Sequence, residues 1–534
     1  MTLTESYWPA DTSSPITDTT VGDLLRDAAA DNPTGVAFVE GMPERSARRR
    51  VTYEQLLEAS EQTARALLGR FEPGERVAVW GGNTLEWLTL EFGCALAGIT
   101  LVTVNPAYKP QELHYVLSQS EAAGLFSMEA YRGNPMRATV EQVRGDLPDL
   151  REVEWLEGLD AFRASGSPSQ ALPTVTADDP AWLLYTSGTT GFPKGALLHH
   201  RGITNDSRLW AERLGFATGD VYVTPMPFFH AGGALLGLGP VHFAGTHVAL
   251  HIFDPALFLE LIESERADIA VGVPTMLIAL MEQPDVATRD VSKLRAVVSG
   301  AASVPADLVR NIESTLGVHF SIVFGQTECT GIATMVKLDD SAEDKAETVG
   351  QALPQIEIKV TDVETGAIVA PGVLGEICIR GYAVMTGYFG MPDATAAAID
   401  QDGWLHTGDL GTMDERGFCR IQGRLKDMII RGGENIYPRE IEAALFEHPA
   451  VGDVSVVGVP DDRWGEQVAA FVRLAPGVAA THQELFAHVR ERLAHYKAPK
   501  YWRFVDDFPL TPSGKIQKFV LRQRWEKGEF EEQS

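Results

Sequence analysis

Apolar and polar positions switch between two periods along the first part of the chain. Short apolar, β-branched or aromatic runs predict buried strands at 76–80, 100–104, 124–127, 268–273, 294–298 and 320–324. Stretches with helical spacing predict helices at 86–97, 111–118, 275–281 and 306–316. Thr52 and Gln55 have the spacing of a capping box, which predicts a helix that begins there and ends at Leu68. Strands that alternate with helices favour layered α/β structure with parallel sheets.

The pattern changes after about residue 350. Short strands separated by glycine turns are predicted at 356–360, 375–379 and 417–421. The last hundred residues then predict strands at 454–459, 467–474 and 501–505 and helices at 438–446 and 483–493. We therefore predict a large N-terminal domain, 1–425, of layered α/β sheets with a small β-rich subdomain, and a small mobile α+β domain, 426–534. A chain of 534 residues exceeds the roughly 300 at which a single core stops growing.

Charge and targeting signals exclude several functional classes. The 73 acidic residues outnumber the 45 basic ones, so the net charge of −28 disfavours a nucleic-acid partner or an anionic membrane surface. The acidic N-terminus has no secretory pattern, and the longest apolar stretch, 95–104, is shorter than the about 20 residues that a membrane span needs. We expect a cytoplasmic protein without membrane insertion. The basic run 48–50 is interpreted as a solvated turn before a helix.

Cysteine usage argues against a disulfide framework or a structural zinc site. The chain has only Cys94, Cys329, Cys378 and Cys419, widely spaced and without a Cys-x-x-Cys pair. Cys329 lies next to Glu328 but has no partnered base near it in sequence, so we reject it as a catalytic nucleophile.

The segment 185–195 has the composition of a phosphate-binding loop. Three glycines, four hydroxyl side chains and Lys194 follow the apolar run 181–184. Glycines let backbone N–H groups approach an oxyanion, and the hydroxyls and the lysine add donors and positive charge. The glycine spacing differs from the Walker pattern, in which a hydroxyl residue follows the lysine. A flexible linker is the alternative, although a linker has no need of a buried strand before it.

Polar residues also follow two other predicted strands. Residues 299–302 and 324–328 lie at carboxyl ends of strands, where open α/β sheets bind ligands. Glu328 can bind magnesium, and a helix N-terminal carboxylate is its alternative interpretation. Asp409 ends the loop 402–409 and can accept hydrogen bonds from two sugar hydroxyls, unless it belongs to an ordinary aspartate turn.

Glycines and charges mark the predicted domain boundary. Residues 423–427 and 431–435 flank a short apolar run, which suits a hinge, although any linker has similar composition. Lys515 ends the turn 509–515 near the C-terminus and, taken alone, is a solvated charge.

Together these segments resemble the AMP-forming acyl-CoA synthetases of the adenylate-forming superfamily. The phosphate loop, residues 225–230, Gly325–Glu328, Thr407–Asp409, residues 423–427 and Lys515 follow the family's order and spacing. The resemblance covers nearly the whole chain and is strongest to the medium-chain fatty acyl-CoA ligase branch at 423–438 and 509–518.

The resemblance implies two half-reactions with MgATP and coenzyme A. A carboxylate attacks the α-phosphate of ATP to give an acyl-adenylate and pyrophosphate, and the thiol of coenzyme A then displaces AMP. The implied catalytic residues are Lys515, His230, Thr327 and Glu328, with Glu328 as the metal ligand. The implied ATP-binding residues are Thr186, Ser187, Gly188, Thr189, Thr190, Lys194, Gly300, Ala301, Ala302, Phe324, Gly325, Gln326, Thr327, Asp409, Arg424 and Lys515.

The acyl pocket and the coenzyme A tunnel follow from the same resemblance. The implied pocket residues are His230, Ala231, Gly232, Gly233, Gly272, Gln326 and Gly331. Lys426 is the implied hinge, and Gly432 and Gly433 line the implied tunnel. A core histidine bonded to a carbonyl is the alternative for His230. Small uncharged residues disfavour an amino-acid substrate, whose ammonium needs a carboxylate.

These residues favour a medium-chain or branched fatty acid as the substrate. A bulky aryl, terpenoid or steroid-derived acid is the alternative. An amide-forming enzyme, which uses an amine in place of coenzyme A, and a luciferase-like monooxygenase share most of these motifs. We expect a monomer or a homodimer.

Overall fold

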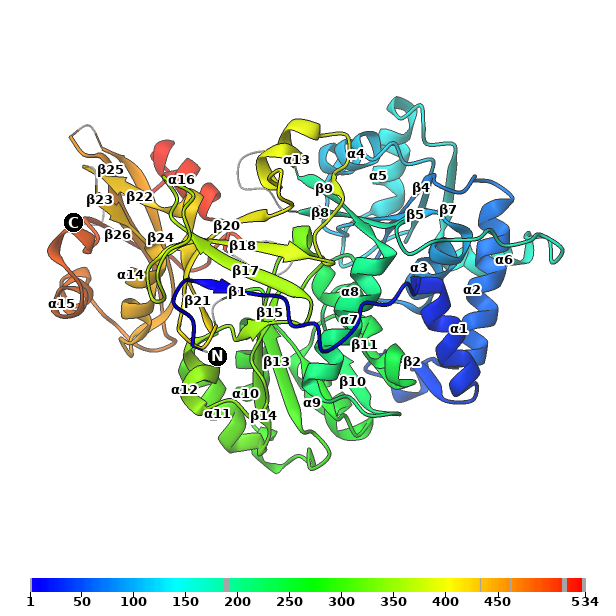
Figure 1. Cartoon of the computed structure of the whole chain (residues 1–534), viewed down its shortest axis with the longest axis horizontal. Coiled ribbons are helices and arrows are strands. Elements are labelled where there is room, and N and C mark those ends of the chain that lie inside the picture. The colour runs from blue at the N-terminus through cyan, green and yellow to red at the C-terminus, as the bar shows by residue number, and fades with distance from the viewer. Residues whose placement is uncertain are drawn as a thin grey trace.

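The large part of the molecule contains two mainly parallel sheets with helices packed against them (Figure 1). The computed structural model describes residues 2–186, 193–302, 304–432, 434–461, 463–510 and 516–530. The predicted α/β architecture is confirmed, since neighbouring strands such as β4 (Arg76–Trp80) and β5 (Thr100–Val104) run parallel.

One sheet has seven strands in the order β19-β9-β8-β5-β4-β6-β7. Its further strands are β6 (Gly124–Ser127), β7 (Glu152–Trp155), β8 (Pro180–Thr186), β9 (Lys194–His199) and β19 (Gly387–Tyr388). The helices of this region are α2 (Tyr53–Leu68), α3 (Leu85–Ala97), α4 (Pro110–Gln119), α5 (Met136–Val143) and α6 (Leu159–Ala164). The predicted capping box is present, because Thr52 Oγ1 accepts from the Gln55 N–H and Gln55 Oε1 accepts from the Thr52 N–H.

The other large sheet has nine strands in the order β16-β15-β14-β13-β12-β10-β11-β2-β3. They are β2 (Val36–Gly41), β3 (Arg50–Thr52), β10 (Val221–Thr224), β11 (Thr246–Leu250), β12 (Ile269–Val271), β13 (Ala296–Gly300), β14 (His319–Phe324), β15 (Thr334–Met335) and β16 (Gln351–Ala352). The helices of this region are α1 (Val21–Asp31), α7 (His200–Leu214), α8 (Ala231–Leu238), α9 (Pro255–Ser264), α10 (Pro274–Met281), α11 (Ala306–Leu316) and α12 (Ala342–Glu347).

The predicted β-rich subdomain is a five-stranded sheet in the order β1-β17-β18-β20-β21. Its strands are β1 (Tyr7–Trp8), β17 (Ile356–Thr361), β18 (Gly375–Gly381), β20 (Leu405–Met413) and β21 (Cys419–Arg424), and α13 (Pro392–Ala398) lies between β19 and β20 in sequence. Strand β1 comes from the N-terminus and was not predicted, because two residues carry no periodicity. The Tyr7 hydroxyl donates to Glu357 Oε2 on the neighbouring strand.

The last hundred residues form a smaller α+β unit beside this sheet (Figure 1). Its strands are β22 (Ile429–Arg431), β23 (Glu434–Ile436), β24 (Val451–Asp461), β25 (Gly465–Leu474) and β26 (Tyr501–Phe504), and its helices are α14 (Pro438–Phe446), α15 (His482–Arg492) and α16 (Lys518–Glu526). The unit has an apolar core of its own, which includes Ile441, Val456 and Val472. Residues 425–427 form the short connection between β21 and β22. A boundary at residue 425 stays a prediction.

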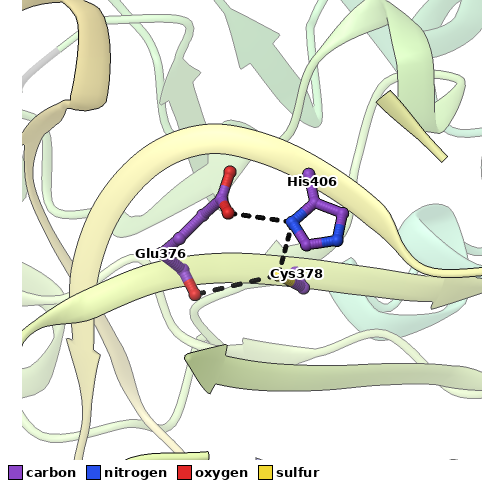
Figure 2. Close-up of side chains that lie close together, drawn as sticks. All are labelled: Glu376, Cys378 and His406. Carbon is purple, nitrogen blue, oxygen red and sulfur yellow. Dashed lines mark hydrogen bonds and ion pairs between the residues drawn. The ribbon is translucent and has the colours of Figure 1, made fainter. Parts of the chain in front are cut away.

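The pairing of β18 with β20 is interrupted by a bulge. Glu376 pairs with Leu410, but Cys378 pairs with His406, so β20 has two more residues than β18 over this span. The extra length lies at Thr407–Asp409. Glu376, Cys378 and His406 gather beside this bulge (Figure 2).

All four cysteines are free and buried, so the expectation of no disulfide framework is confirmed. No helix among the described residues is both long and apolar enough to cross a bilayer.

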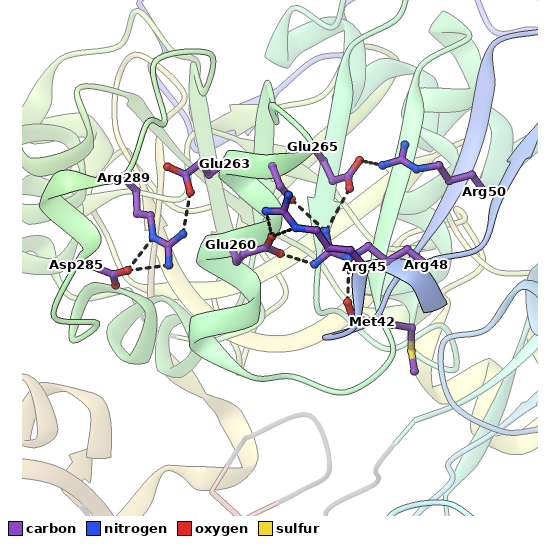
Figure 3. A network of polar contacts seen from close by, with 10 residues as sticks. Met42, Arg45, Arg48, Arg50, Glu260, Glu263, Glu265, Asp285 and Arg289 are labelled. Carbon is purple, nitrogen blue, oxygen red and sulfur yellow. Dashed lines mark hydrogen bonds and ion pairs between the residues drawn. The ribbon is translucent and has the colours of Figure 1, made fainter.

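The interpretation of 48–50 as a solvated turn is wrong for Arg48. Its side chain is 4% exposed and forms ion pairs with Glu260 of α9 and with Glu265 (Figure 3). Arg48 also donates to the Met42 carbonyl oxygen and to Ser264 Oγ. Local sequence carries no sign of this pairing, because the acidic partners lie more than 200 residues away.

Replacement of Arg48 by Ala is expected to destabilise the large domain by about 2–4 kcal/mol, because it removes the buried cation that two poorly hydrated carboxylates share and leaves them only the more exposed Arg45 and Arg50. Arg45 provides a matched control, since its side chain is 73% exposed while it pairs with the same Glu260. Arg45→Ala should cost no more than about 1 kcal/mol. Urea unfolding followed by tryptophan fluorescence measures both. Equal losses in the two variants would contradict a buried role for Arg48.

Candidate functional site

Two of the predicted ligand-binding segments leave neighbouring strands side by side. β13 and β14 are parallel, and Gly300 pairs with Val323. A Cβ atom at Gly300 would lie 2.6 Å from the Val323 carbonyl oxygen, so only glycine fits this strand end. Ala301 then has φ +65°, a left-handed conformation that costs a non-glycine residue about 1–2 kcal/mol. Residues 300–302 and 324–328 are thus brought together, as expected.

The segment after β14 folds back on itself. A Cβ atom at Gly325 would lie 2.2 Å from the Gly331 carbonyl oxygen, and Thr327–Cys329 form a single 3₁₀ turn between these glycines. Thr330 Oγ1 donates to the Ala383 carbonyl oxygen at 2.5 Å. Glu328 therefore projects from a tight turn that is anchored to the chain before β19.

Tyr388 lies between Glu328 and Lys194 and was not predicted from the sequence. Its hydroxyl donates to Glu328 Oε1 at 2.7 Å, and the Lys194 ammonium lies 4.9 Å from the centre of its ring. Burial raises the pKa of Tyr388, and the Glu328 carboxylate raises it further, so the phenol remains a hydrogen-bond donor at neutral pH. The two-residue strand β19 carries no periodic signal that could have revealed it.

The carboxylate oxygens of Glu328 are suitable ligands for magnesium. Tyr388 binds one carboxylate oxygen, and no hydrogen bond to the other, Oε2, is found among the residues that the structure describes. A carboxylate oxygen together with phosphate oxygens is the coordination that magnesium prefers. Glu328 would therefore be the protein ligand of a magnesium ion bound with ATP.

The phosphate loop is described only at its two ends. Thr186 at the end of β8 pairs with Lys194 at the start of β9, and Thr186 Oγ1 donates to the Lys194 carbonyl oxygen at 3.4 Å. The predicted phosphate ligands Ser187, Gly188, Thr189 and Thr190 lie outside the described residues. Their roles stay predictions.

Asp409 and Arg424 meet on paired strands, as a shared role in ribose binding requires. Arg424 Nε donates to Asp409 Oδ1 at 3.0 Å, and the Asp409 side chain is 6% exposed. Gln326 Nε2 donates to the Thr407 carbonyl oxygen at 3.4 Å, which links the turn of Glu328 to the β20 bulge. The predicted α-phosphate, metal and ribose ligands thus lie in one connected region.

His230 caps α8 through its own side chain. Nδ1 accepts from the Gly232 N–H at 3.0 Å, which places the proton of the neutral ring on Nε2. The cap uses Nδ1 alone, so it does not decide between the pocket role and the alternative of a core histidine bonded to a carbonyl. Whether His230 gates the acyl pocket stays a prediction.

Two of the predicted acyl-pocket glycines are in close contact with other groups. A Cβ atom at Gly233 would lie 2.1 Å from the Pro227 carbonyl oxygen, and one at Gly331 would lie 2.4 Å from Leu235 Cδ2. Packing alone therefore requires glycine at both positions, whether or not the two residues also line the acyl pocket. Gly272 is less crowded, since a Cβ atom there would lie 3.3 Å from Leu277 Cδ2.

Lys426 lies close to the predicted nucleotide-binding residues Asp409 and Glu328. Burial lowers the pKa of Lys426 and the charge of Arg424 lowers it further, whereas the carboxylates of Asp409 and Glu328 act in the opposite direction. The predicted hinge is thus within electrostatic reach of both acids. The described contacts of Gly432 stay within the small unit, where a Cβ atom would lie 2.5 Å from Trp464. Gly433 and Lys515 lie outside the described residues.

Two stretches of the chain match known families. Residues 25–389 match the family described as AMP-binding enzyme, and residues 440–515 match the AMP-binding enzyme C-terminal domain. YngI of Bacillus subtilis (strain 168) is 39% identical over 538 residues, which cover 95% of this chain and 97% of YngI. The human mitochondrial medium-chain acyl-CoA ligase ACSF2 is 37% identical over 557 residues, which cover 98% of this chain and 90% of the ligase.

A solved relative is similar in two states. ATP-bound MatB from Rhodopseudomonas palustris superposes with a TM-score of 0.87 at 31% identity, over 95% of this chain and 99% of MatB. Apo MatB gives a TM-score of 0.76 at 30% identity with the same coverage. Identity and coverage barely differ between the two, so the score alone ranks this chain as more similar to the ATP-bound structure.

The cysteines are expected to be inert toward alkylation in the folded protein. Burial raises the pKa of Cys329, Cys378 and Cys419 to about 12 and also raises that of Cys94, so at pH 8 only about one thiol in ten thousand is a thiolate. Iodoacetamide at pH 8, followed by intact-protein mass measurement, should add no label, whereas the protein in guanidinium should take up four. Rapid labelling of Cys329 with loss of nucleotide binding would contradict its structural role.

Proposed function

Because the chain belongs to the AMP-binding enzyme family, we propose that it joins a medium-chain or branched fatty acid to coenzyme A with ATP. The products are the acyl-CoA thioester, AMP and pyrophosphate. The observation that supports this best is the contact of Tyr388 with both Glu328 and Lys194. Tyr388 links the carboxylate that we assign to magnesium with the cation that we assign to phosphate, and Gln326 connects this region to the strand of Asp409, which pairs with Arg424.

In the first half-reaction, a carboxylate oxygen of the acid attacks the α-phosphorus and the bond to the β-phosphate oxygen breaks. Thr186, Lys194 and the loop between them hold the departing pyrophosphate, and Thr327 contacts the α-phosphate. Glu328 would hold a magnesium ion, which would supply positive charge to the phosphates. Lys515 bridges the attacking carboxylate and the α-phosphate, where charge shifts during transfer.

In the second half-reaction, the thiol sulfur of coenzyme A attacks the carbonyl carbon of the acyl-adenylate and AMP leaves. Lys515 has no role at that carbon, so the small domain turns about Lys426 and brings Gly432 and Gly433 to the pantetheine path. The similarity to ATP-bound MatB supports an arrangement suited to the first half-reaction.

The choice of acid rests on two observations. The medium-chain ligase ACSF2 is similar over almost the whole chain, and the predicted pocket residues Ala231, Gly232 and Gly272 carry no charge. An apolar pocket discriminates by only about 10- to 200-fold per methylene, so several acids should be accepted. A cytoplasmic location and a monomeric or homodimeric state complete the proposal.

Pyrophosphate release across a panel of acids tests the function. We expect octanoate to exceed acetate and palmitate in kcat/KM by about 10-fold or more, and thioester to form only with coenzyme A present. A benzoate derivative or a bile acid as the best substrate would favour the bulky-acid alternative. An amide product formed with an amine as the only acceptor would favour the amide-forming alternative.

Lys515→Ala should separate the two half-reactions. Adenylate formation should fall by about 100-fold or more, because one preorganised charge at the transferring group is lost. Thioester formation from supplied octanoyl-adenylate should change by no more than about 3-fold, since Lys515 does not act there. Pyrophosphate release and thioester formation are measured separately.

Gly433→Trp is the reciprocal control, because a bulky side chain in the pantetheine path should block only the second half-reaction. Equal loss of both half-reactions in Lys515→Ala would refute the alternation of the small domain.

A further inference from the structure

The bulge that carries Asp409 leaves backbone groups of two strands without their ladder partners. Between the pairs Glu376–Leu410 and Cys378–His406, β18 has one residue and β20 has three. Two side chains replace the missing ladder bonds. Thr407 Oγ1 donates to the Ile377 carbonyl oxygen at 2.6 Å, and Glu376 Oε1 accepts from the Gly408 N–H at 2.9 Å.

Glu376 binds the bulge at two points. While Oε1 accepts from Gly408, Oε2 lies 2.9 Å from His406 Nδ1. The side chain of Glu376 is 13% exposed, so these contacts are largely shielded from water. Gly408 has φ +68°, a conformation that favours glycine, and a Cβ atom there would meet none of the described atoms within 4 Å. The hydrogen bond from the Gly408 N–H to Glu376 therefore limits the backbone freedom of the glycine that immediately precedes Asp409.

His406 extends this anchor to the other end of the loop. Its Nε2 lies 3.5 Å from Asp400 Oδ2, and Asp400 Oδ1 accepts from the N–H groups of Asp402 and Trp404. Glu376 and Asp400 thus hold the imidazole from both sides. The segment 400–409 is fixed at its start and at its bulge.

The same cluster is poorly suited to a metal ion. Potential ligand atoms of Glu376, Cys378 and His406 lie within 4.8 Å of one another. However, the His406 nitrogen that faces the cluster, Nδ1, already contacts both the Glu376 carboxylate and the Cys378 thiol. A hydrogen-bonded anchor accounts for these contacts more fully (Figure 2).

We propose that Glu376, supported by His406, is a positioning residue that holds the 407–409 bulge so that Asp409 meets the ribose of the nucleotide. This rests on the proposed ribose role of Asp409. Arg424 fixes Asp409 from one strand, and Glu376 fixes the bulge from the other. Neither Glu376 nor His406 touches the reacting atoms.

The test compares binding of MgATP with that of Mg-2′,3′-dideoxy-ATP, which lacks both ribose hydroxyls, by calorimetry. Glu376→Ala should raise the Kd for MgATP by about 10- to 100-fold, because two hydrogen bonds to an ionised group are lost. The Kd for dideoxy-ATP should hardly change. The preference for ATP should collapse in Glu376→Ala and, because Asp409 is the proposed ribose ligand, equally in Asp409→Ala.

Two variants separate positioning from stability. Glu376→Gln keeps an oxygen that can accept from Gly408 and an N–H₂ group that can contact His406, so it should recover most of the preference for ATP. If Glu376→Ala does not fold, the ATP preference of Glu376→Gln still tests the inference. Glu357→Ala removes a carboxylate of similar exposure, 18%, which pairs with Arg380 on the same sheet. It should lower the melting temperature without changing the ATP preference.

A wild-type ATP preference in folded Glu376→Ala would overturn the inference, as would an equal loss in Glu357→Ala. Nucleotide binding is measured without acid or coenzyme A, so absence of thioester formation would reject the proposed function alone.

Discussion

The hydrogen bond from Tyr388 to Glu328 joins parts of the chain that belong to different sheets. Tyr388 is in β19 at the edge of the seven-stranded sheet, and Glu328 follows β14 of the nine-stranded sheet. The contact of the Lys194 ammonium with the Tyr388 ring depends on the same placement. A relative shift of the two sheets would separate the predicted phosphate and metal ligands, so the geometry of the predicted site depends on the contacts of this phenol.

The five-stranded sheet contributes Asp409 to the predicted site, and it does so at the bulge in β20. Regular antiparallel pairing would place Asp409 opposite a residue of β18, whereas the bulge in β20 removes it from that ladder and leaves it paired with Arg424 of β21. Thr407 and Glu376 satisfy the freed backbone groups, so the bulge costs little while it presents a carboxylate. Lys426 lies two residues after the end of β21, so the position where we predict the small domain to begin is within electrostatic reach of Asp409 and Glu328.

Local signals predicted much of the fold. The bounds of β4, β5, β6, α11 and α14 agree with the predicted ranges, because period and capping are read within one element. Strands β1 and β19 were missed, since two residues acquire strand character only from a distant partner. Motif order predicted that Gly300, Glu328 and Asp409 would lie in one site. Tyr388, Glu376 and the pairing of Arg48 could not be predicted, because each depends on residues that are far away in sequence.

The pairing of β19 with β9 also constrains how the protein is made. Lys194 precedes Tyr388 by nearly 200 residues, which a ribosome adds in about 10–40 s. During that time the strands β4, β5 and β8 can pair, but the edge strand β9 has no β19 and the cation of Lys194 has no ring to lie against. A nascent chain that ends before residue 388 therefore has neither a completed sheet edge nor a formed nucleotide site.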